Sequence, residues 1–262
     1  MMQGVKREMT ISKIVVGVLT YNRPELLEET LHSFNEYLKA YRDLFEFVIF
    51  DNGSKDEIIK INKKIAQKYR SKFVTSRKVM ESTKNSKIRD HNISIGHRNL
   101  SRLMKKEDGD AYIIVEDDWA CDAYIPLIEL IEYLRKNPDI GQIRLRNSRY
   151  DGTLTGGAKH NFVTQEPIKW TKEVVIGNYI LAYGNLHWVN NPSIISNEAL
   201  DLISKGYNSE VECMKAFHEM YPINLQLQPG VFEHIGPWRH REDLVEQGII
   251  QGEDNNESFD FS

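Results

Sequence analysis

The sequence has few of the residues that would commit it to a special class of fold. Its 262 residues include only two cysteines, Cys121 and Cys213, too few for a disulfide framework or for a zinc site on their own. No apolar run approaches the ~20 residues that span a bilayer, and no signal-type apolar stretch follows the charged N-terminus. We therefore expect a soluble, cytoplasmic protein of a reducing compartment, with no transmembrane segment.

Glycine and proline are also scarce. Sixteen glycines and eight prolines exclude a fibrous or low-complexity chain, and neither GxGxxG nor GxxxxGK[ST] is present to mark a nucleotide-binding loop. Hydrophobic residues make up 40% and charged residues 27%, which is ordinary for a globular chain and argues against disorder. The length suits one large domain or two small ones with a sizeable core.

Positive charge is concentrated in one segment, although the net charge is only −4. Residues 60–106 contain fifteen Lys or Arg residues and two acidic residues, so this segment carries +13 and the remainder carries −17. One interpretation is a set of solvated helix faces. The other is a basic surface that faces an anionic partner, such as nucleotide phosphates, a nucleic-acid backbone or an anionic lipid surface.

Apolar runs alternate with helical patterns through the first half of the chain. The runs predict strands at 14–19, 45–50, 73–79 and 111–115, and the spacing of apolar residues predicts helices from Pro24, over 57–69 and over 96–106. This alternation predicts an α/β fold with a mainly parallel central sheet flanked by helices. Beyond it we expect helices at 125–136, 197–204 and 210–220, a strand at 142–146, extended chain at 225–232, and a loop-and-strand wall at 147–192.

Acidic residues end two of the predicted strands, at the sheet edge where open α/β folds bind ligands. Glu116, Asp117 and Asp118 are adjacent, and their mutual repulsion would be relieved by a divalent cation such as Mg²⁺ or Mn²⁺. The alternative is an exposed acidic turn. Asp51 ends another strand, where it either shapes a turn with Ser54 as a helix N-cap or hydrogen-bonds a nucleobase.

Four segments taken together resemble the nucleotide-sugar half of GT-A fold glycosyltransferases, with family 2 of the glycosyltransferases the most similar. They are residues 18–27 (VLTYNRPELL), 48–54 (VIFDNGS), 96–100 (GHRNL) and 114–118 (IVEDD). Each is weak alone, but their order and spacing agree over residues 12–119. Glu-Asp-Asp also looks like the form that the DxD motif takes in the GlcNAc-transferase I group. The resemblance implies a GT-A type, Rossmann-like sheet with a smaller acceptor-side region.

The resemblance also implies the donor-side chemistry. The donor is expected to be a nucleoside-diphosphate sugar, most simply a UDP-sugar, with Mn²⁺ or Mg²⁺ as the cofactor. Asp118 is expected to ligate the metal, and His234 on a late strand to complete its shell. The other donor-binding residues that the resemblance implies are Thr20, Tyr21, Asn22, Arg23, Asp51, Arg98, Glu116 and Asp117. Arg239 and Arg241 follow His234, and either cover the diphosphate as a closing loop or form an ordinary basic turn.

The second half is similar to the family at an acid-rich helix start. There a carboxylate deprotonates the acceptor hydroxyl, and here the candidates are Glu210, which we favour, and Glu212. The alternative is that both acids simply meet the positive end of the helix dipole. Trp188 and Asn190 are expected to form an acceptor-side wall for a sugar.

These patterns predict a metal-dependent inverting glycosyltransferase, a hexosyl- or pentosyltransferase that works by single displacement. We expect an N-terminal extension (1–11), a nucleotide-sugar half (12–119), an acceptor half of the same catalytic domain (120–241) and a C-terminal tail (242–262). The alternatives are a sugar nucleotidyltransferase and a non-catalytic nucleotide-sugar-binding module. The acceptor could be a glycan, a lipid-linked sugar or, given the basic segment, modified DNA or another polyanion.

Overall fold

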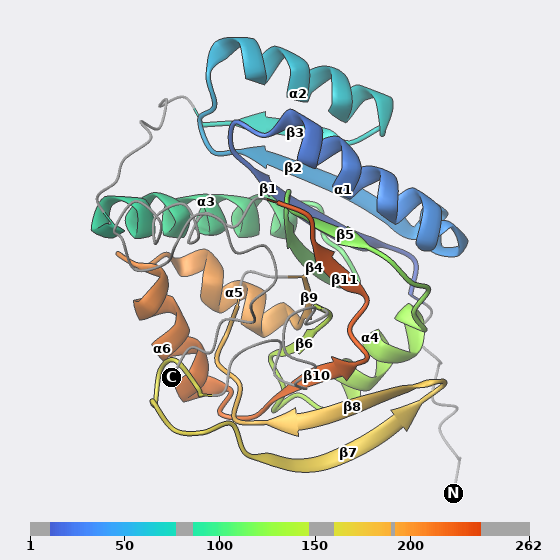
Figure 1. Ribbon diagram of the computed structural model, residues 1–262, viewed down its shortest axis with the longest axis vertical. Helices are drawn as coiled ribbons and strands as arrows, with labels where there is room; N and C mark the ends of the chain where they lie inside the picture. The colour runs from blue at the N-terminus through green and yellow to red at the C-terminus, as the bar shows by residue number, and fades with distance from the viewer. Residues whose placement is uncertain (1–10, 77–85, 147–159, 190–191, 237–262) are drawn as a thin grey trace, which may run out of the picture.

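The computed structural model describes residues 11–76, 86–146, 160–189 and 192–236. A nine-stranded sheet in the order β3-β2-β1-β4-β9-β6-β10-β8-β7 runs through the molecule, with helices packed on both of its faces (Figure 1). The strands are β1 (Ile14–Thr20), β2 (Phe45–Asp51), β3 (Lys72–Thr75), β4 (Ala111–Glu116), β5 (Trp119–Cys121), β6 (Gln142–Arg144), β7 (Trp170–Ile176), β8 (Tyr179–Gly184), β9 (Ser193–Ile195), β10 (Asn224–Gln228) and β11 (Phe232–His234).

Six α-helices and one 3₁₀ helix lie in the described parts of the chain. They are α1 (Pro24–Tyr37), η1 (Lys39–Leu44), α2 (Asp56–Lys68), α3 (Ser86–Lys106), α4 (Leu127–Lys136), α5 (Asn197–Lys205) and α6 (Glu210–Met220). Pro24 stands at the first helical position of α1, where its missing N–H costs nothing. No helix among these residues combines the length and the apolar composition that crossing a membrane requires.

The expected α/β fold with its parallel sheet is confirmed, and the parallel pairing is concentrated in the first half. Strands β3, β2, β1 and β4 are parallel neighbours, joined by crossover helices, and β6 is parallel to β10. Antiparallel β9 joins β4 to β6, and β8 and β7 extend the far edge as an antiparallel hairpin. The second half of the chain therefore continues the same sheet, and a separate small sheet pairs β11 with β5.

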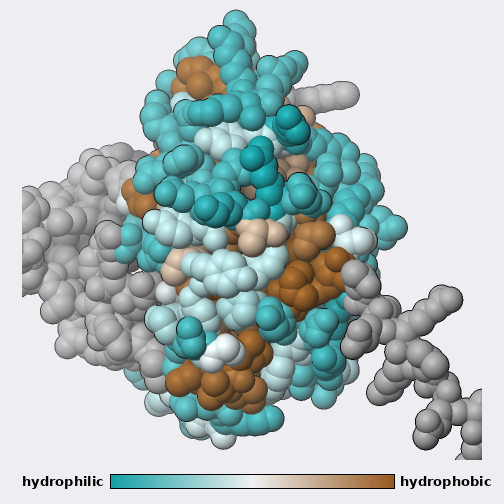
Figure 2. Space-filling view, turned by 90° about the vertical axis from the view of Figure 1, so that its right-hand side faces the viewer, coloured by the Kyte–Doolittle hydropathy of each residue, from teal (hydrophilic) through white to brown (hydrophobic). Residues whose placement is uncertain are grey.

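Two apolar clusters cover the two faces of the sheet. All seven residues of β1 are buried, and successive side chains alternate between the clusters, as the run of β-branched residues predicts. One cluster holds apolar residues of α1 and α4, and we call its side the α1/α4 face. The other holds residues of α3, α5 and α6, and we call its side the α3/α5/α6 face. Hydrophilic side chains cover most of the surface seen in Figure 2, and apolar ones gather in a few patches.

The two largest differences from the sequence-based boundaries concern helix α3 and strand β3. Helix α3 begins at Ser86, ten residues before the predicted start near Gly96. Its first turns carry few apolar residues, so the sequence gives no helical pattern there. A hydrogen bond to the chain between α5 and α6 stabilises this part of the helix: Ser94 Oγ donates to Tyr207 O at 2.9 Å. The strand expected at 73–79 ends at Thr75, where its pairing with Asp51 of β2 also ends.

Candidate functional site

The ends of β1, β2 and β4 bring the predicted donor-side residues to one edge of the sheet. Thr20 is paired with Asp51 in the register of β1 and β2, and Leu19 is paired with Glu116 in that of β1 and β4. The acidic trio therefore begins level with the end of β1. This is the edge at which parallel α/β sheets bind ligands, because each crossover leaves its loop there.

Arg23 holds the second and third acids of the trio. Its two terminal nitrogens pair with Asp117 Oδ1 and Asp118 Oδ2. Asp117 is completely buried, and its Oδ2 accepts a hydrogen bond from Thr20 Oγ1 at 2.7 Å and one from Tyr21 N at 3.3 Å. Burial raises the pKa of Asp117 to about 7, although the positive charge of Arg23 acts in the opposite direction. Asp117 thus ties the loop after β1 to the end of β4.

His234 and Asp118, the two predicted metal ligands, lie side by side. Pairing of β11 with β5 sets His234 opposite Trp119, and its Nε2 lies 3.5 Å from Asp118 Oδ2. Burial alone would raise the pKa of Asp118, but the hydrogen bond from His234 and the charge of Arg23 lower it to about 2. The chain passes so close after His234 that a Cβ on Gly236 would lie 2.7 Å from Asp118 Cβ.

The side chains of Asp118 and His234 offer an oxygen and a nitrogen that could coordinate a Mn²⁺ or Mg²⁺ ion. Asp118 Oδ1 is buried and has no hydrogen-bond partner among the described residues, so an acceptor oxygen stands ready beside the imidazole of His234. No group of three or more His, Cys, Asp or Glu side chains in the described parts of the chain could hold a metal by itself. The fit therefore requires that diphosphate oxygens and water supply the remaining ligands, as hard cations commonly allow.

His97 connects the end of β4 to the cavity beside α6, and sequence reasoning missed it. The ring is buried, and its Nε2 lies 3.4 Å from Glu116 Oε1. It packs against Trp188 in a T-shaped arrangement, with ring centroids 5.8 Å apart at an interplanar angle of 90°. The residue stands within residues 96–100 (GHRNL), where the resemblance implies a role only for Arg98. A histidine on the sheet-facing side of a helix gives no sequence signal that separates it from core.

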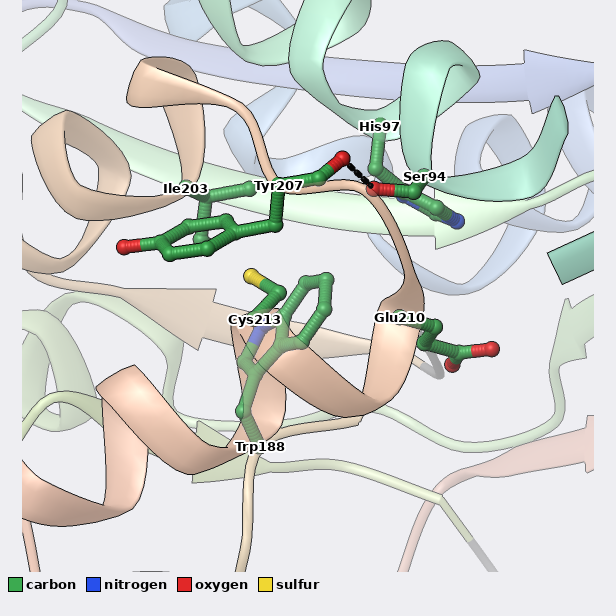
Figure 3. Close-up of a pocket in the computed structure, with 7 residues that line it drawn as sticks. All are labelled: Ser94, His97, Trp188, Ile203, Tyr207, Glu210 and Cys213. Carbon is green, nitrogen blue, oxygen red and sulfur yellow. Dashed lines mark hydrogen bonds between the residues drawn. The ribbon is translucent and has the colours of Figure 1, made fainter. Parts of the chain in front are cut away.

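A small cavity of about 10 Å³ lies between α3, α5 and α6, and Glu210 is among the residues that line it. The others are Ser94, His97, Trp188, Ile203, Tyr207 and Cys213. The ring of His97 and the carboxylate of Glu210 extend toward the same side of this cavity (Figure 3). The favoured base candidate therefore lies near the residue that pairs with Glu116.

Glu212 has a different role in the structure. It is exposed, its Oε2 accepts a hydrogen bond from Asn208 N at 3.0 Å, and its own N–H donates to Ser209 Oγ at 3.2 Å. Ser209 is the N-cap of α6, so the two side chains close the helix start in the manner of a capping box. The alternative that both acids meet the positive end of the helix dipole fits Glu210 as well as Glu212, since both lie in the first turn of α6. Glu212 in addition takes part in capping the helix.

Asp51 is completely buried and bound within its own turn. Its Oδ1 accepts hydrogen bonds from Gly53 N and Ser54 N, and its Oδ2 accepts one from Asn62 Nδ2 at 2.9 Å. In the alternative where Asp51 shapes a turn, Ser54 is expected to cap the next helix; that part is wrong, because α2 begins at Asp56 with Lys55 at the N-cap. These contacts make Asp51 a builder of the turn, and its contact with a nucleobase stays a prediction.

Asn22 joins the loops that follow β1 and β2. It adopts the left-handed conformation (φ 55°), its N–H donates to Ser54 Oγ at 2.8 Å, and its Oδ1 accepts from Lys55 N at 3.0 Å. Arg98 packs against Gly206 at the end of α5, where a Cβ on the glycine would lie 2.2 Å from Arg98 Cδ. Its predicted place near the nucleotide remains a prediction.

Trp188, predicted as an acceptor-side wall, is 1% exposed and belongs to the core of the α3/α5/α6 face. It borders the small cavity while its other side stacks on Phe217, with centroids 6.2 Å apart. Three further predicted residues, Asn190, Arg239 and Arg241, lie outside the described residues.

With this geometry in view, the chain can be assigned to a family. The family model described as "Glycosyl transferase family 2" matches residues 15–181, well over half of the chain, and the protein belongs to that family. No curated protein matches the sequence.

Solved structures of similar fold are also glycosyltransferases. A mannosyltransferase from Pyrobaculum calidifontis, PcManGT in complex with GDP-Man and Mn²⁺, superposes with a TM-score of 0.60 at 15% identity, covering 91% of this chain and 61% of the other. GalNAc-T7 with UDP, GalNAc and Mn²⁺ gives 0.56 at 13% identity, with coverage of 87% and 44%. TarS from S. aureus, residues 1–349, gives 0.54 at 16%, with coverage of 94% and 67%. The chain thus spans about three-fifths of PcManGT, and these likenesses establish the GT-A fold.

Proposed function

We propose that this protein is a metal-dependent inverting glycosyltransferase. It would move a sugar from a nucleoside-diphosphate donor, most simply a UDP-sugar, to an acceptor hydroxyl. The observation that carries this proposal is the pairing of Asp118 with His234 at the end of β4, with Asp118 Oδ1 buried and lacking a hydrogen-bond partner among the described residues. A diphosphate brought to this edge would meet this pair together with the guanidinium of Arg23.

On the donor side, Asp118 and His234 would hold Mn²⁺ or Mg²⁺, whose charge neutralises the leaving diphosphate. Arg23 adds a fixed positive charge next to Asp117 and Asp118, and a guanidinium suits phosphate oxygens. Asp51 and Asn22 shape the two loops that border the nucleotide. Glu116 would contact the ribose, and His97, next to the carboxylate of Glu116, would help to hold that carboxylate in place.

On the acceptor side, Glu210 would act as the general base. Its carboxylate takes the proton of the acceptor hydroxyl while that oxygen forms a bond to the anomeric carbon and the bond from carbon to the diphosphate oxygen breaks. Attack on the side opposite the leaving group inverts the configuration. Glu210 stands at the first position of α6 beside the cavity that His97 and Trp188 also line, which supports its choice over the capping residue Glu212.

Thermal unfolding with a panel of donors tests the proposal. UDP-, GDP-, TDP- and CMP-sugars are each added with Mn²⁺ or with EDTA, and the matching donor should raise the melting temperature more when Mn²⁺ is present. The variant Asp118→Asn should lose the part of the shift that depends on Mn²⁺. The exposed Asp139→Asn, in the turn between α4 and β6, is the matched control and should keep it.

Turnover is measured on the same samples as hydrolysis of the donor that stands out. The proposal expects hydrolysis that requires Mn²⁺ or Mg²⁺ and disappears in Asp118→Asn. Donor binding without any turnover would instead support a nucleotide-sugar-binding module. An equal shift with EDTA and with Mn²⁺ would contradict the metal site.

A further inference from the structure

Arg144 is a buried charge with few partners in the middle of the sheet. It is 0% exposed, and one terminal nitrogen, Nη2, donates to the backbone oxygen of His187. Its Nε and Nη1 are buried without a hydrogen-bond partner among the described residues. His187 O also accepts from Gln142 Nε2 at 2.9 Å, so this carbonyl does not need the arginine. Burying a guanidinium with two nitrogens that make no hydrogen bond lowers the stability of the fold unless another group pairs with it.

The described surroundings of Arg144 supply positive charge and no carboxylate. Burial lowers the pKa of Arg144, and the charge of Arg146 lowers it further. His187 is kept neutral, because burial and the charges of Arg144 and Arg146 lower its pKa to about 2. The charge of Arg146 thus adds to the cost of burying Arg144, and an anion bound at Arg144 would offset that cost.

The position of Arg144 in the sheet indicates which part of a substrate it would meet. Its neighbour in β9 is Ser193, which in turn is paired with Ile114 of β4. Two strand spacings, about 10 Å, thus separate it sideways from the strand that ends in the acidic trio. Ile143 and Leu145 belong to the core of the α1/α4 face. The side chain of Arg144 therefore lies on the opposite face of the sheet, which also carries His97, Trp188 and Glu210.

Arg146 extends this charge toward the edge of the sheet. It is only partly buried, and it forms an isolated bridge with Phe232 at the start of β11, the strand that carries His234. We propose that Arg144 and Arg146 form an oxyanion site that binds a phosphate or carboxylate group of the acceptor. That the anion belongs to an acceptor rests on the proposed function. That an anion binds here at all rests on the buried Arg144.

The experiment measures anion binding while the nucleotide site is filled. The full chain is saturated with UDP and Mg²⁺, and its melting temperature is followed against inorganic phosphate, acetate or chloride at equal ionic strength. Phosphate or acetate should raise the melting temperature of the wild type, and chloride should not. The stronger of the two identifies the acceptor group as phosphate or carboxylate. A response to neither of them would overturn the proposal.

Arg144→Met removes the charge and keeps most of the side-chain volume. It should abolish the anion-dependent shift and, without anion, melt at or above the wild-type temperature, because an unpaired buried charge is gone. Arg102→Met is the control, since this exposed arginine donates to Ser204 O from the surface of α3 and should leave the anion shift unchanged. A strong loss of stability in Arg144→Met would show that Arg144 pairs with an acid of the chain itself, and would overturn the proposal.

Arg146→Gln is the second variant, because this residue is nearer the surface. It should weaken phosphate or acetate binding at least about tenfold, which is the loss of about 1.4 kcal/mol. Retention of full affinity would contradict the site. The UDP-dependent shift separates the two proposals: an anion site with no UDP shift refutes only the donor assignment, and a UDP shift with no Arg144-dependent anion shift refutes only the inference about Arg144.

A final arm distinguishes the acceptor from the donor sugar. If the anion were a uronic acid of the donor, the wild type would hydrolyse UDP-glucuronate faster than UDP-glucose, whereas Arg144→Met would hydrolyse the two donors at equal rates. The acceptor proposal expects the ratio of the two rates to be the same in both proteins. A ratio that depends on Arg144 would assign the site to the donor and overturn the proposal as stated.

Discussion

His97 of α3 and Glu116 at the end of β4 form a contact, with Nε2 of the histidine 3.4 Å from Oε1 of the carboxylate. Glu116 ends the strand that leads into the acidic trio, whereas His97 borders the cavity that Glu210 also lines. One imidazole thus contacts Glu116 and lines the same cavity as Glu210, the proposed base. Because the ring is buried against Trp188, it has little freedom to turn away from either.

Replacing this ring should affect catalysis more than donor binding. We expect His97→Phe to lower kcat roughly tenfold, since losing a contact of ~1.4 kcal/mol in the transition state costs that factor. The donor affinity from thermal shift should change less than threefold. Ser94→Ala, at another residue of the same cavity, is the control for packing. An unchanged kcat in His97→Phe would reduce His97 to a core residue.

Substituting each of the two acids at the start of α6 should affect sugar transfer differently. Glu210→Gln keeps the shape of the side chain but removes the base, so transfer should fall by about 10²–10⁴-fold while the donor still binds. Glu212→Gln should keep transfer, because its hydrogen bond to Asn208 N belongs to the helix start. The measurement is the rate of sugar transfer beside the melting temperature of each variant. The opposite pattern would make Glu212 the base.

The ends of the strong strands could be predicted from the sequence because residue type and position agree there. Continuous runs of β-branched residues identify β1 and β4, and acids that interrupt such runs stand at the sheet edge. Asp118 was predicted at that edge in the same way, because it follows the apolar run of β4. The approach of His234 depends on the pairing of β11 with β5, which no local pattern specifies, and it was predicted only through the family resemblance.

Other features depend on tertiary contacts that a single sequence does not encode locally. The early start of α3 is held by bonds such as that of Ser94 to Tyr207, more than a hundred residues away. Arg144 lies within the predicted strand 142–146, and its residue type gives no sign that it is fully buried in β6, between β9 and β10 of the sheet.

Asp51 tests the difference between a turn residue and a base-binding residue. The sequence alone predicts that its loss mainly raises the Michaelis constant for the donor. With Asp51 buried and accepting bonds from Gly53 N, Ser54 N and Asn62, we expect Asp51→Asn to lower the free energy of unfolding by ~1–3 kcal/mol as well, because an amide N–H₂ would replace an acceptor. Urea denaturation and UDP affinity are measured together, with the exposed Asp56→Asn as the control.

A fall in UDP affinity with unchanged stability would show that Asp51 faces the nucleotide more than its own turn. A fall in stability with normal affinity, measured well below the melting temperature, would remove Asp51 from the binding site. The structure leads us to expect both effects, since the turn that Asp51 builds is linked through Ser54 to Asn22 of the neighbouring loop.

Gly141 controls how closely α6 approaches the sheet. A Cβ at this position would lie 2.6 Å from Phe217 Cζ and 2.6 Å from Tyr221 Cδ2, and both rings are buried. Gly141→Ala should therefore lower the free energy of unfolding by ~1–3 kcal/mol through overpacking. Because Phe217 stacks on Trp188, the displaced helix should also move Glu210, and kcat should fall more than donor affinity.

The double variant Gly141→Ala/Phe217→Leu is the decisive comparison. The smaller side chain makes room for the new methyl group, so the cost of Gly141→Ala should be smaller in the Phe217→Leu background than in the wild type. Urea denaturation of the four proteins gives the coupling free energy, which for residues in contact is ~0.5–3 kcal/mol. Additive losses would mean that the ring of Phe217 yields without strain, and that α6 owes its distance from the sheet to other contacts.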